Sequence, residues 1–396
     1  MDSSLKDANR MIVNAQWKKM ELLYKKNNQV LIHETQNKVA KEIVYCFTVL
    51  NKSLVNLTAP VQWGKTGTIL KTIYLMCSIE NNDKIINYEN VFIITGLSDN
   101  EWLSQTKDRL PKEWRDNVFH RNRFDFNTFK DKKDTLIIID ECHIASGEEQ
   151  TITEVLKEAG ILNIDYLLKN NIKILQTSAT PDNLLIHSDG WGDAYEKINV
   201  SLPKTYVSFK DIKDDGRLFP TLNLYSELDL LIQLIETFKR PKYHLFRINS
   251  SHYDDHRSIL ERLSFEKNYQ ILIHDYTSKI KNAEKMLEIE PDKHTFILLK
   301  GMWRASKTFT DKNIGIVCES LASNKDFSSE VQGLPGRMCG HNKIRGKDGP
   351  LIFCKVEAID EYINLINNGF QYKELDKWKT KNLIIKDKFI SKCDEC

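Results

Sequence analysis

Short apolar segments rich in β-branched residues alternate along this chain with amphipathic segments of helical periodicity. Such apolar runs are typical of strands buried on both faces, and the segments between them are long enough for crossover helices. The pattern therefore predicts right-handed βαβ units and an α/β fold class with mainly parallel sheets flanked by helices. The predicted strands are residues 54–58, 91–95, 136–139, 172–176, 243–248, 271–273, 295–299, 314–318 and 351–353. The predicted helices are residues 35–50, 65–79, 99–110, 148–159, 226–238, 254–263, 278–288 and 357–366.

The length of the chain and one polar stretch predict two domains. The chain has 396 residues, and single domains commonly run about 100–200 residues. A polar stretch at residues 201–220, which carries Asp211, Asp214, Asp215 and Gly216, separates the two groups of strands. We expect it to be the linker between an N-terminal domain of residues 1–205, with a helical extension at its start, and a C-terminal domain of residues 206–396.

The charge balance and the cysteine pattern restrict the function classes. Lys and Arg number 57 and Asp and Glu number 55, so a polyanionic partner would have to bind local basic patches. No apolar run approaches the roughly 18–20 residues of a membrane span, and the polar N-terminus lacks a secretory signal. The eight cysteines lack the dense spacing of a disulfide scaffold. We therefore expect an intracellular protein that is not secreted and has no membrane partner.

Four cysteines raise the question of a zinc site. Cys393 and Cys396 form a C-x-x-C pair, and Cys339 and Cys354 precede it. Four thiolates can bind Zn²⁺ tetrahedrally, but structural zinc sites usually pair two such motifs at regular spacing. Only one pair is present here, so we favour free thiols over zinc.

The strand at residues 54–58 runs directly into a segment with the composition of a phosphate-binding loop, and a helix follows. Gly64 lets the backbone approach phosphates, and the amides of the helix N-terminus face the anion. Lys65 would place a positive charge on the β- and γ-phosphates, and Thr66 would offer a hydroxyl to Mg²⁺. The alternative is an ordinary helix N-terminus with a solvated lysine. The nucleotide-binding candidates are Ala59, Pro60, Val61, Gln62, Trp63, Gly64, Lys65, Thr66 and Gly67.

The strand at residues 136–139 is followed by two carboxylates, about 75 residues after Lys65. An acidic pair is costly to bury, so we expect it at the open carboxyl edge of the sheet, where ligands bind. Asp140 would hold Mg²⁺, and Glu141 would orient and deprotonate the attacking water. His143 could link the nucleotide site to the second domain. A solvated turn is the alternative, but together with the lysine loop the pair predicts a nucleoside triphosphatase.

At this point the chain resembles the superfamily 2 helicases and translocases. The sequence Asp140-Glu141-Cys142-His143 resembles their DExH box in its DECH form, and residues 59–66 resemble their first motif. The resemblance implies two RecA-like domains with an ATP site in the cleft between them. It also implies that Gln36 reads adenine. Residues that match the third motif, and that would couple hydrolysis to nucleic-acid movement, are Ser178, Ala179 and Thr180.

The second half matches the family less closely but in the expected order. Residues 300–307 stand where the fifth motif belongs, and residues 332–337 stand where QxxGRxxR belongs. The latter has one extra residue after Gln332 and lacks the final arginine. Arg337 is therefore the candidate arginine finger, and Arg345 is a distant candidate for the second arginine. The variants Gly-Met-Trp-Arg-Ala-Ser and Gln-Gly-Leu-Pro-Gly-Arg look similar to helicases of large phages and large DNA viruses.

The resemblance implies a motor that holds ATP and Mg²⁺ and moves along a phosphate backbone. We expect a helicase or translocase that favours DNA and works in the cytoplasm, at the nucleoid or at a viral replication site. The alternatives are an RNA helicase, a translocase that moves without unwinding among accessory proteins, and a binding module with a decayed ATPase. Expected backbone contacts are Thr95, Gly96, Lys107, Arg109, Arg247, Lys300, Gly301, Arg304, Ser306 and Lys307.

Overall fold

The computed structural model describes residues 3–371 and Trp378, except for residues 81–83, 96–99, 121–122, 142–150, 181–189, 249, 304–309 and 320–326. The chain divides into two compact units. The first unit comprises Met1–Pro60, Gly64–Ser201 and Phe370–Cys396, and the second unit comprises Val61–Trp63 and Leu202–Gly369.

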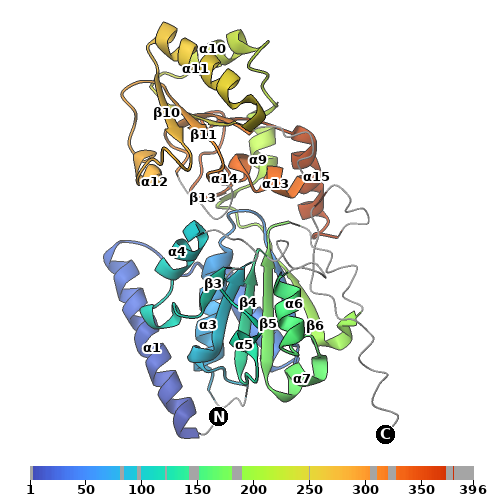
Figure 1. The fold of residues 1–396 in the computed structure, drawn as a ribbon. Helices are drawn as coiled ribbons and strands as arrows, with labels where there is room; N and C mark the ends of the chain where they lie inside the picture. The colour runs from blue at the N-terminus through green and yellow to red at the C-terminus, as the bar shows by residue number, and fades with distance from the viewer. Residues whose placement is uncertain are drawn as a thin grey trace. The chain divides into compact units, whose positions relative to one another are not determined.

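The first unit is built on a six-stranded parallel sheet with the order β3-β2-β4-β5-β1-β6 (Figure 1). Its strands are β1 (Leu54–Thr58), β2 (Val91–Thr95), β3 (Val118–His120), β4 (Thr135–Asp140), β5 (Ile172–Ser178) and β6 (Tyr195–Asn199). Every residue of β1, β2 and β5 is buried. A strand buried at every position needs cover on both faces, which explains why these strands are continuous apolar runs.

Helices cover the sheet of the first unit on both faces. They are α1 (Ser3–Lys26), α2 (Glu34–Thr48), α3 (Lys65–Ser78), α4 (Asn100–Asp108), α5 (Phe126–Phe129), α6 (Thr151–Glu158) and α7 (Ile164–Lys169), with short 3₁₀ helices at Tyr88–Asn90, Lys112–Trp114 and Gly192–Ala194. A core of Ile137, Ile174, Leu156 and Leu167 joins one sheet face to α6 and α7. Alternate strand residues point to the opposite face, where α2 and α3 pack.

The N-terminal helix α1 packs along α3 (Figure 1). The Trp17 ring stacks on Tyr74 with centroids 4.2 Å apart, and the Lys71 ammonium lies 4.7 Å and 4.4 Å from the two ring centroids. The Asn9 amide donates to the carbonyl of Cys77 at 2.8 Å. The predicted N-terminal extension is thus part of the first unit.

The second unit contains another six-stranded parallel sheet, with the order β10-β11-β9-β12-β14-β8. Its strands are β8 (Leu218–Pro220), β9 (Tyr243–Arg247), β10 (Gln270–His274), β11 (Thr295–Leu299), β12 (Ile314–Cys318) and β14 (Leu351–Cys354), and a separate pair is formed by β7 (Tyr206–Val207) and β13 (Gly340–His341). Its helices are α9 (Phe209–Asp214), α10 (Leu228–Glu236), α11 (Tyr253–Lys267), α12 (Ala283–Met286), α13 (Phe327–Val331), α14 (Leu334–Arg337) and α15 (Val356–Asn367), with a 3₁₀ turn at Ser250–His252. Leu231 of α10 and Leu260 of α11 share a core with Phe246 and Phe296.

The predicted linker at residues 201–220 is wrong in one respect, because the structure gives most of it regular secondary structure. It contains β7, α9 and β8, and all of it after Ser201 belongs to the second unit. Ser208 caps α9, since its hydroxyl accepts from the Asp211 amide at 3.2 Å and its own amide donates to the Asp211 carboxylate at 2.7 Å. The run of polar residues therefore reflects a capped short helix.

Other sequence predictions differ from the structure mainly in short or exposed elements. The helix predicted at residues 278–288 is only α12, because the Asp275 carboxylate accepts from the amides of Thr277 and Ser278 and forms a turn instead. The edge strands β3, β6 and β8 and the two-residue strands β7 and β13 were not predicted. Within the described residues, no helix combines the length and apolarity that a membrane crossing requires.

Gln176 on β5 gives a prediction about stability. It is fully buried, and neither polar atom of its side chain has a hydrogen-bond partner. A buried amide in this state costs about 1–3 kcal/mol. We expect Gln176→Met to raise the unfolding free energy of the first unit by about that amount in urea titrations. The exposed Gln29→Met is the control, and an unchanged or lower midpoint for Gln176→Met would contradict the prediction.

Two neighbouring histidines in the second unit give a prediction about pH. The buried His244 Nε2 lies 3.0 Å from His294 Nδ1. Burial, and then the charges of His294 and Lys242, hold the pKa of His244 well below its usual value. Since the unfolded chain takes up this proton near pH 6.5 and the folded chain does not, stability is lost as the pH falls below about 6.5, by up to about 1.4 kcal/mol per pH unit.

The measurement is the melting temperature at about pH 7.5 and about pH 5.5. The melting temperature of the second unit should fall between these two pH values in the wild type. We expect it to fall less in His244→Phe. The exposed His252→Phe serves as the control. An equal acid-induced fall in the wild type and in His244→Phe would show that His244 does not carry the effect.

Candidate nucleotide-binding site

The carboxyl ends of three neighbouring strands bring the predicted motifs of the first unit together. β5 lies between β1 and β4, with Thr58 in register with Ser178, and Thr177 in register with Asp140. The Ala59 amide donates to the carbonyl of Ser178 at 3.0 Å. The phosphate-loop candidate, the S-A-T segment and the acidic pair therefore lie at one edge of the sheet, as expected for parallel strands.

Lys65 and Glu141 form an ion pair at this edge. The Lys65 Nζ lies 3.2 Å from Glu141 Oε1, and each side chain is 11% exposed. Glu141 has a positive φ of 52°, an uncommon conformation for a residue other than glycine. The pair places a lysine and a general-base candidate against each other, although 75 residues separate them in the chain.

Asp140 is held by three hydrogen bonds. Its Oδ1 accepts from the Thr177 hydroxyl at 2.7 Å and from the Glu141 amide at 3.1 Å, and its Oδ2 accepts from the indole of Trp102 at 3.1 Å. Burial and then the neighbouring Glu141 raise the pKa of Asp140, while Lys65 and the hydrogen bonds of Thr177 and Trp102 oppose the rise. The sequence analysis did not predict that Thr177 and Trp102 bind Asp140.

Gln36 lies directly on the glycines of the loop. Its amide donates to the Gly64 carbonyl at 3.0 Å, and its oxygen accepts from the His33 amide at 2.8 Å. A Cβ added at Gly64 or Gly67 would lie 2.4 Å or 2.6 Å from the Gln36 amide nitrogen, so a larger residue at either position would displace the Gln36 side chain. At Gly64, a φ of 108° adds a conformational reason for glycine. The role of Gln36 in reading adenine stays a prediction.

Thr66 has a partner that the sequence analysis placed elsewhere. The Arg109 guanidinium donates to the Thr66 hydroxyl at 3.0 Å. Arg109 was predicted to contact a nucleic-acid backbone, but here it lies against the nucleotide-site threonine. Thr66 and Asp140 offer a hydroxyl and a carboxylate oxygen, the ligand types that Mg²⁺ prefers, so the donor set fits this ion.

The remaining loop and coupling residues are mostly buried. Ala59, Val61 and Trp63 are at most 4% exposed, and Val61, Gln62 and Trp63 are grouped with the second unit. The Ser178 hydroxyl donates to the carbonyl of Thr180 at 3.0 Å and accepts from its amide at 3.2 Å, which forms a local turn. His143 lies outside the described residues.

The candidate arginine finger lies in the second unit. Arg337 ends α14 and is 6% exposed, and its guanidinium donates to the carbonyl of Gln332 at 2.7 Å. The hydrogen bond ties the guanidinium to the glutamine that begins the same motif. α14 contains Pro335 near its start, as a short helix tolerates.

No protein-family model and no curated protein sequence matches the chain significantly. Among solved structures, the DEAD-box helicase Mss116 bound to single-stranded RNA and UDP-BeF is 14% identical over 87% of this chain and 76% of its own, with a TM-score of 0.51. S. cerevisiae Dbp5 bound to RNA and ADP BeF3 is 13% identical over 85% and 88%, with a TM-score of 0.48. RecG bound to a three-way DNA junction is 14% identical over 93% and 51%, with a TM-score of 0.44.

The likeness to Mss116 concerns the fold, and it agrees with two parallel sheets flanked by helices. The two units are RecA-like domains. The predicted fold class is thereby confirmed.

The second RecA-like domain gives a mixed result for the predicted nucleic-acid contacts. Lys300 places its ammonium 4.3 Å from the centroid of Tyr253. Gly301 has a φ of 73°, and its carbonyl accepts from the hydroxyl of Tyr276, whose side chain is 80% exposed. Arg247 is wrong as a backbone contact, because it is buried in an ion pair with Glu319 at 2.7 Å.

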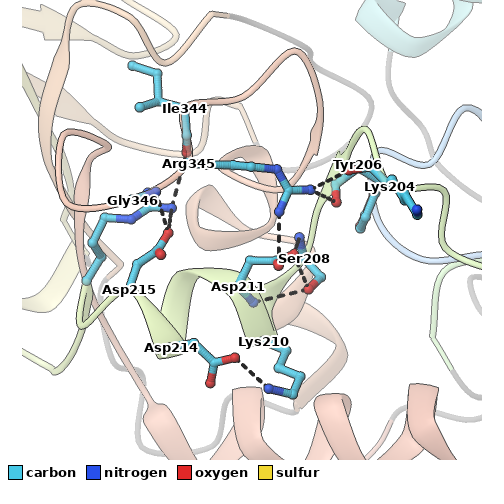
Figure 2. Close-up of polar contacts among 11 residues, drawn as sticks. Lys204, Tyr206, Ser208, Lys210, Asp211, Asp214, Asp215, Ile344, Arg345 and Gly346 are labelled. Carbon is cyan, nitrogen blue, oxygen red and sulfur yellow. Dashed lines mark hydrogen bonds and ion pairs between the residues drawn. The ribbon is translucent and has the colours of Figure 1, made fainter.

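Arg345, the distant candidate for the second motif arginine, is held by residues of the second unit. Figure 2 shows its guanidinium against the segment before α9. It donates to the carbonyls of Lys204 and Tyr206 at 2.7 Å and 2.8 Å, and to the Asp211 carboxylate at 3.1 Å. Its three partners account for its position, so Arg345 fastens the start of the second RecA-like domain.

Several predicted residues keep their status as predictions. Thr95 is fully buried at the end of β2, in register with Asp140. Cys339 and Cys354 are fully buried. Residues that lie outside the described part of the chain are Gly96, Arg304, Ser306, Lys307, Cys393 and Cys396.

Proposed function

We propose that the protein is an ATP-dependent nucleic-acid helicase or translocase of the superfamily 2 type. The observation that carries the proposal is the convergence of Lys65, Glu141 and Asp140 at the carboxyl edge of one RecA-like sheet. A lysine, a metal-binding carboxylate and a general base are the parts that phosphoryl transfer to water requires.

The residues divide the reaction among themselves. The loop amides and Lys65 would hold the triphosphate, and Thr66 and Asp140 would hold Mg²⁺, which would neutralise charge on the phosphates. Glu141 would leave its ion pair with Lys65 when the lysine turns to the phosphates, and it would then take a proton from water. Arg337 would neutralise charge on the γ-phosphate from the second domain. His143 and Gln332 complete the predicted catalytic set.

The partner of the motor is proposed to be DNA, with RNA as the alternative. Mss116 and Dbp5 are described with RNA and RecG with a DNA junction, so helicases of this fold occur with either polymer. The motif variants of the second half, which look similar to those of phage and viral helicases, favour DNA. A translocase that moves without unwinding is the second alternative.

The deciding experiment measures ATP turnover by the full chain alone and with single-stranded DNA, double-stranded DNA or RNA of equal length. We expect stimulation, strongest with DNA. Stimulation by RNA alone would replace DNA with RNA in the proposal. Absence of turnover under every condition would overturn the proposal and favour a binding module.

A further inference from the structure

Two buried, oppositely charged side chains lie at the carboxyl ends of neighbouring strands in the second unit. β9 ends at Arg247, and Glu319 follows β12 directly, with the two strands paired in parallel. The Arg247 Nε lies 2.7 Å from Glu319 Oε1, and the side chains are 10% and 0% exposed. Buried ion pairs are weak sources of stability because desolvation offsets their attraction, so their other contacts matter.

Arg247 connects the pair to the loop after β11. Its two terminal nitrogens donate to the carbonyls of Met302 at 2.7 Å and Trp303 at 2.9 Å. The loop has positive φ angles at Gly301 (73°) and Trp303 (53°). A positive φ at tryptophan is unfavourable, so the loop needs outside contacts to keep this shape. Arg247 supplies two of them.

Glu319 connects the same pair to the helix that carries Arg337. Its Oε2 accepts from the Leu334 amide, the first of α14, at 2.7 Å. A Cβ at Gly333 would lie 2.6 Å from this oxygen, so glycine allows the close approach. A carboxylate at a helix N-terminus is also favoured by the helix dipole. α14 is therefore fixed at its start by a side chain whose other oxygen is held by Arg247.

We propose that Arg247 and Glu319 form a relay through which a phosphodiester backbone on residues 300–303 sets the position of Arg337. This inference rests on the proposed function, because it assigns the loop to nucleic acid and Arg337 to ATP. Movement of the Met302 and Trp303 carbonyls shifts the guanidinium, which shifts Glu319 and the start of α14. Arg247 and Glu319 are positioning residues, since they contact neither substrate.

Arg247→Lys tests the relay with little change in charge. Lysine keeps an ion pair with Glu319, but a single amine cannot reach one carboxylate and two carbonyls with the fork geometry of arginine. We expect DNA-stimulated ATP turnover to fall by about 5- to 30-fold, with the KM for ATP and the turnover without DNA changed less than about 2-fold. Arg257→Lys, at an exposed pair with Glu261 in the same unit, is the matched control.

A double variant separates a relay from independent structural effects. If Arg247 and Glu319 act through one another, the double variant Arg247→Lys/Glu319→Gln should have about the same DNA-stimulated ATP turnover as the more impaired single variant. Equal losses of basal and stimulated turnover, or fully additive losses, would overturn the proposal.

Hydrogen exchange of the wild-type chain tests the relay without any variant, should these substitutions prevent folding. Binding of a single-stranded oligo-dT or oligo-U of about 20 nucleotides, without ATP, should change exchange at the amides of Leu334, Gly336 and Arg337. Unchanged exchange there, with the oligonucleotide bound, would overturn the relay. A wild-type chain whose ATP turnover no polymer stimulates would instead overturn the proposed function.

Discussion

Glu141→Gln is expected to reduce ATP turnover by about 10²–10⁴-fold, the usual contribution of a general base. Glutamine keeps the shape of the side chain at the positive φ of this position, but it cannot accept the proton of the attacking water. ATP binding should persist, because the loop amides and Lys65 do not depend on the carboxylate. Loss of the ion pair even frees Lys65 for the phosphates.

The measurement pairs steady-state turnover with the Kd of a fluorescent ATP analogue. Glu158→Gln, an exposed carboxylate on α6, is the control and should behave as the wild type. Turnover close to that of the wild type in Glu141→Gln would reject the general-base role. Loss of analogue binding together with turnover would assign Glu141 to nucleotide binding instead.

Arg337→Ala is expected to reduce nucleic-acid-stimulated turnover by about 10³–10⁵-fold, the range for an arginine that stabilises the transferring phosphoryl group. Its Kd for the ATP analogue should stay close to that of the wild type, because Lys65 and Thr66 belong to the first unit. Arg337→Lys should recover little, since lysine lacks the planar fork of guanidinium.

A control is needed because Arg337 is buried and donates to the Gln332 carbonyl. The melting temperature of each variant shows whether the second unit remains folded. Arg262→Ala, which removes a 67% exposed guanidinium of the same unit, should leave turnover unchanged. A folded Arg337→Ala variant with full turnover would remove Arg337 from the mechanism.

The central strands could be predicted from the sequence because burial on both faces leaves a continuous apolar run. β1, β2, β11 and β12 have the predicted bounds. The edge strand β6 has only one buried residue among five, and β7 and β13 have two residues each, so they carry no such signal. Their existence depends on partners distant in the chain.

The residues of the candidate site could be predicted where their positions depend on the carboxyl ends of parallel strands. Lys65 and Asp140 follow strands whose carboxyl ends lie at one edge, and the register of β4 and β5 places Thr177 beside Asp140. Trp102 and Arg109 come from α4 and the turn after it, and no sequence period tells which side chains of that segment reach the site. Only the three-dimensional structure shows that Trp102 and Arg109 contact the candidate site.

The contacts of Arg345 indicate where a fragment of the second unit would have to begin. The Lys204 and Tyr206 carbonyls accept its hydrogen bonds, and Tyr206 and Val207 pair with β13, which directly follows Cys339. A fragment that starts at Ser208 would delete both acceptors and one strand of this pair. A fragment that starts at Leu202 retains them, so its N-terminus belongs at the start of the segment whose polarity suggested a linker.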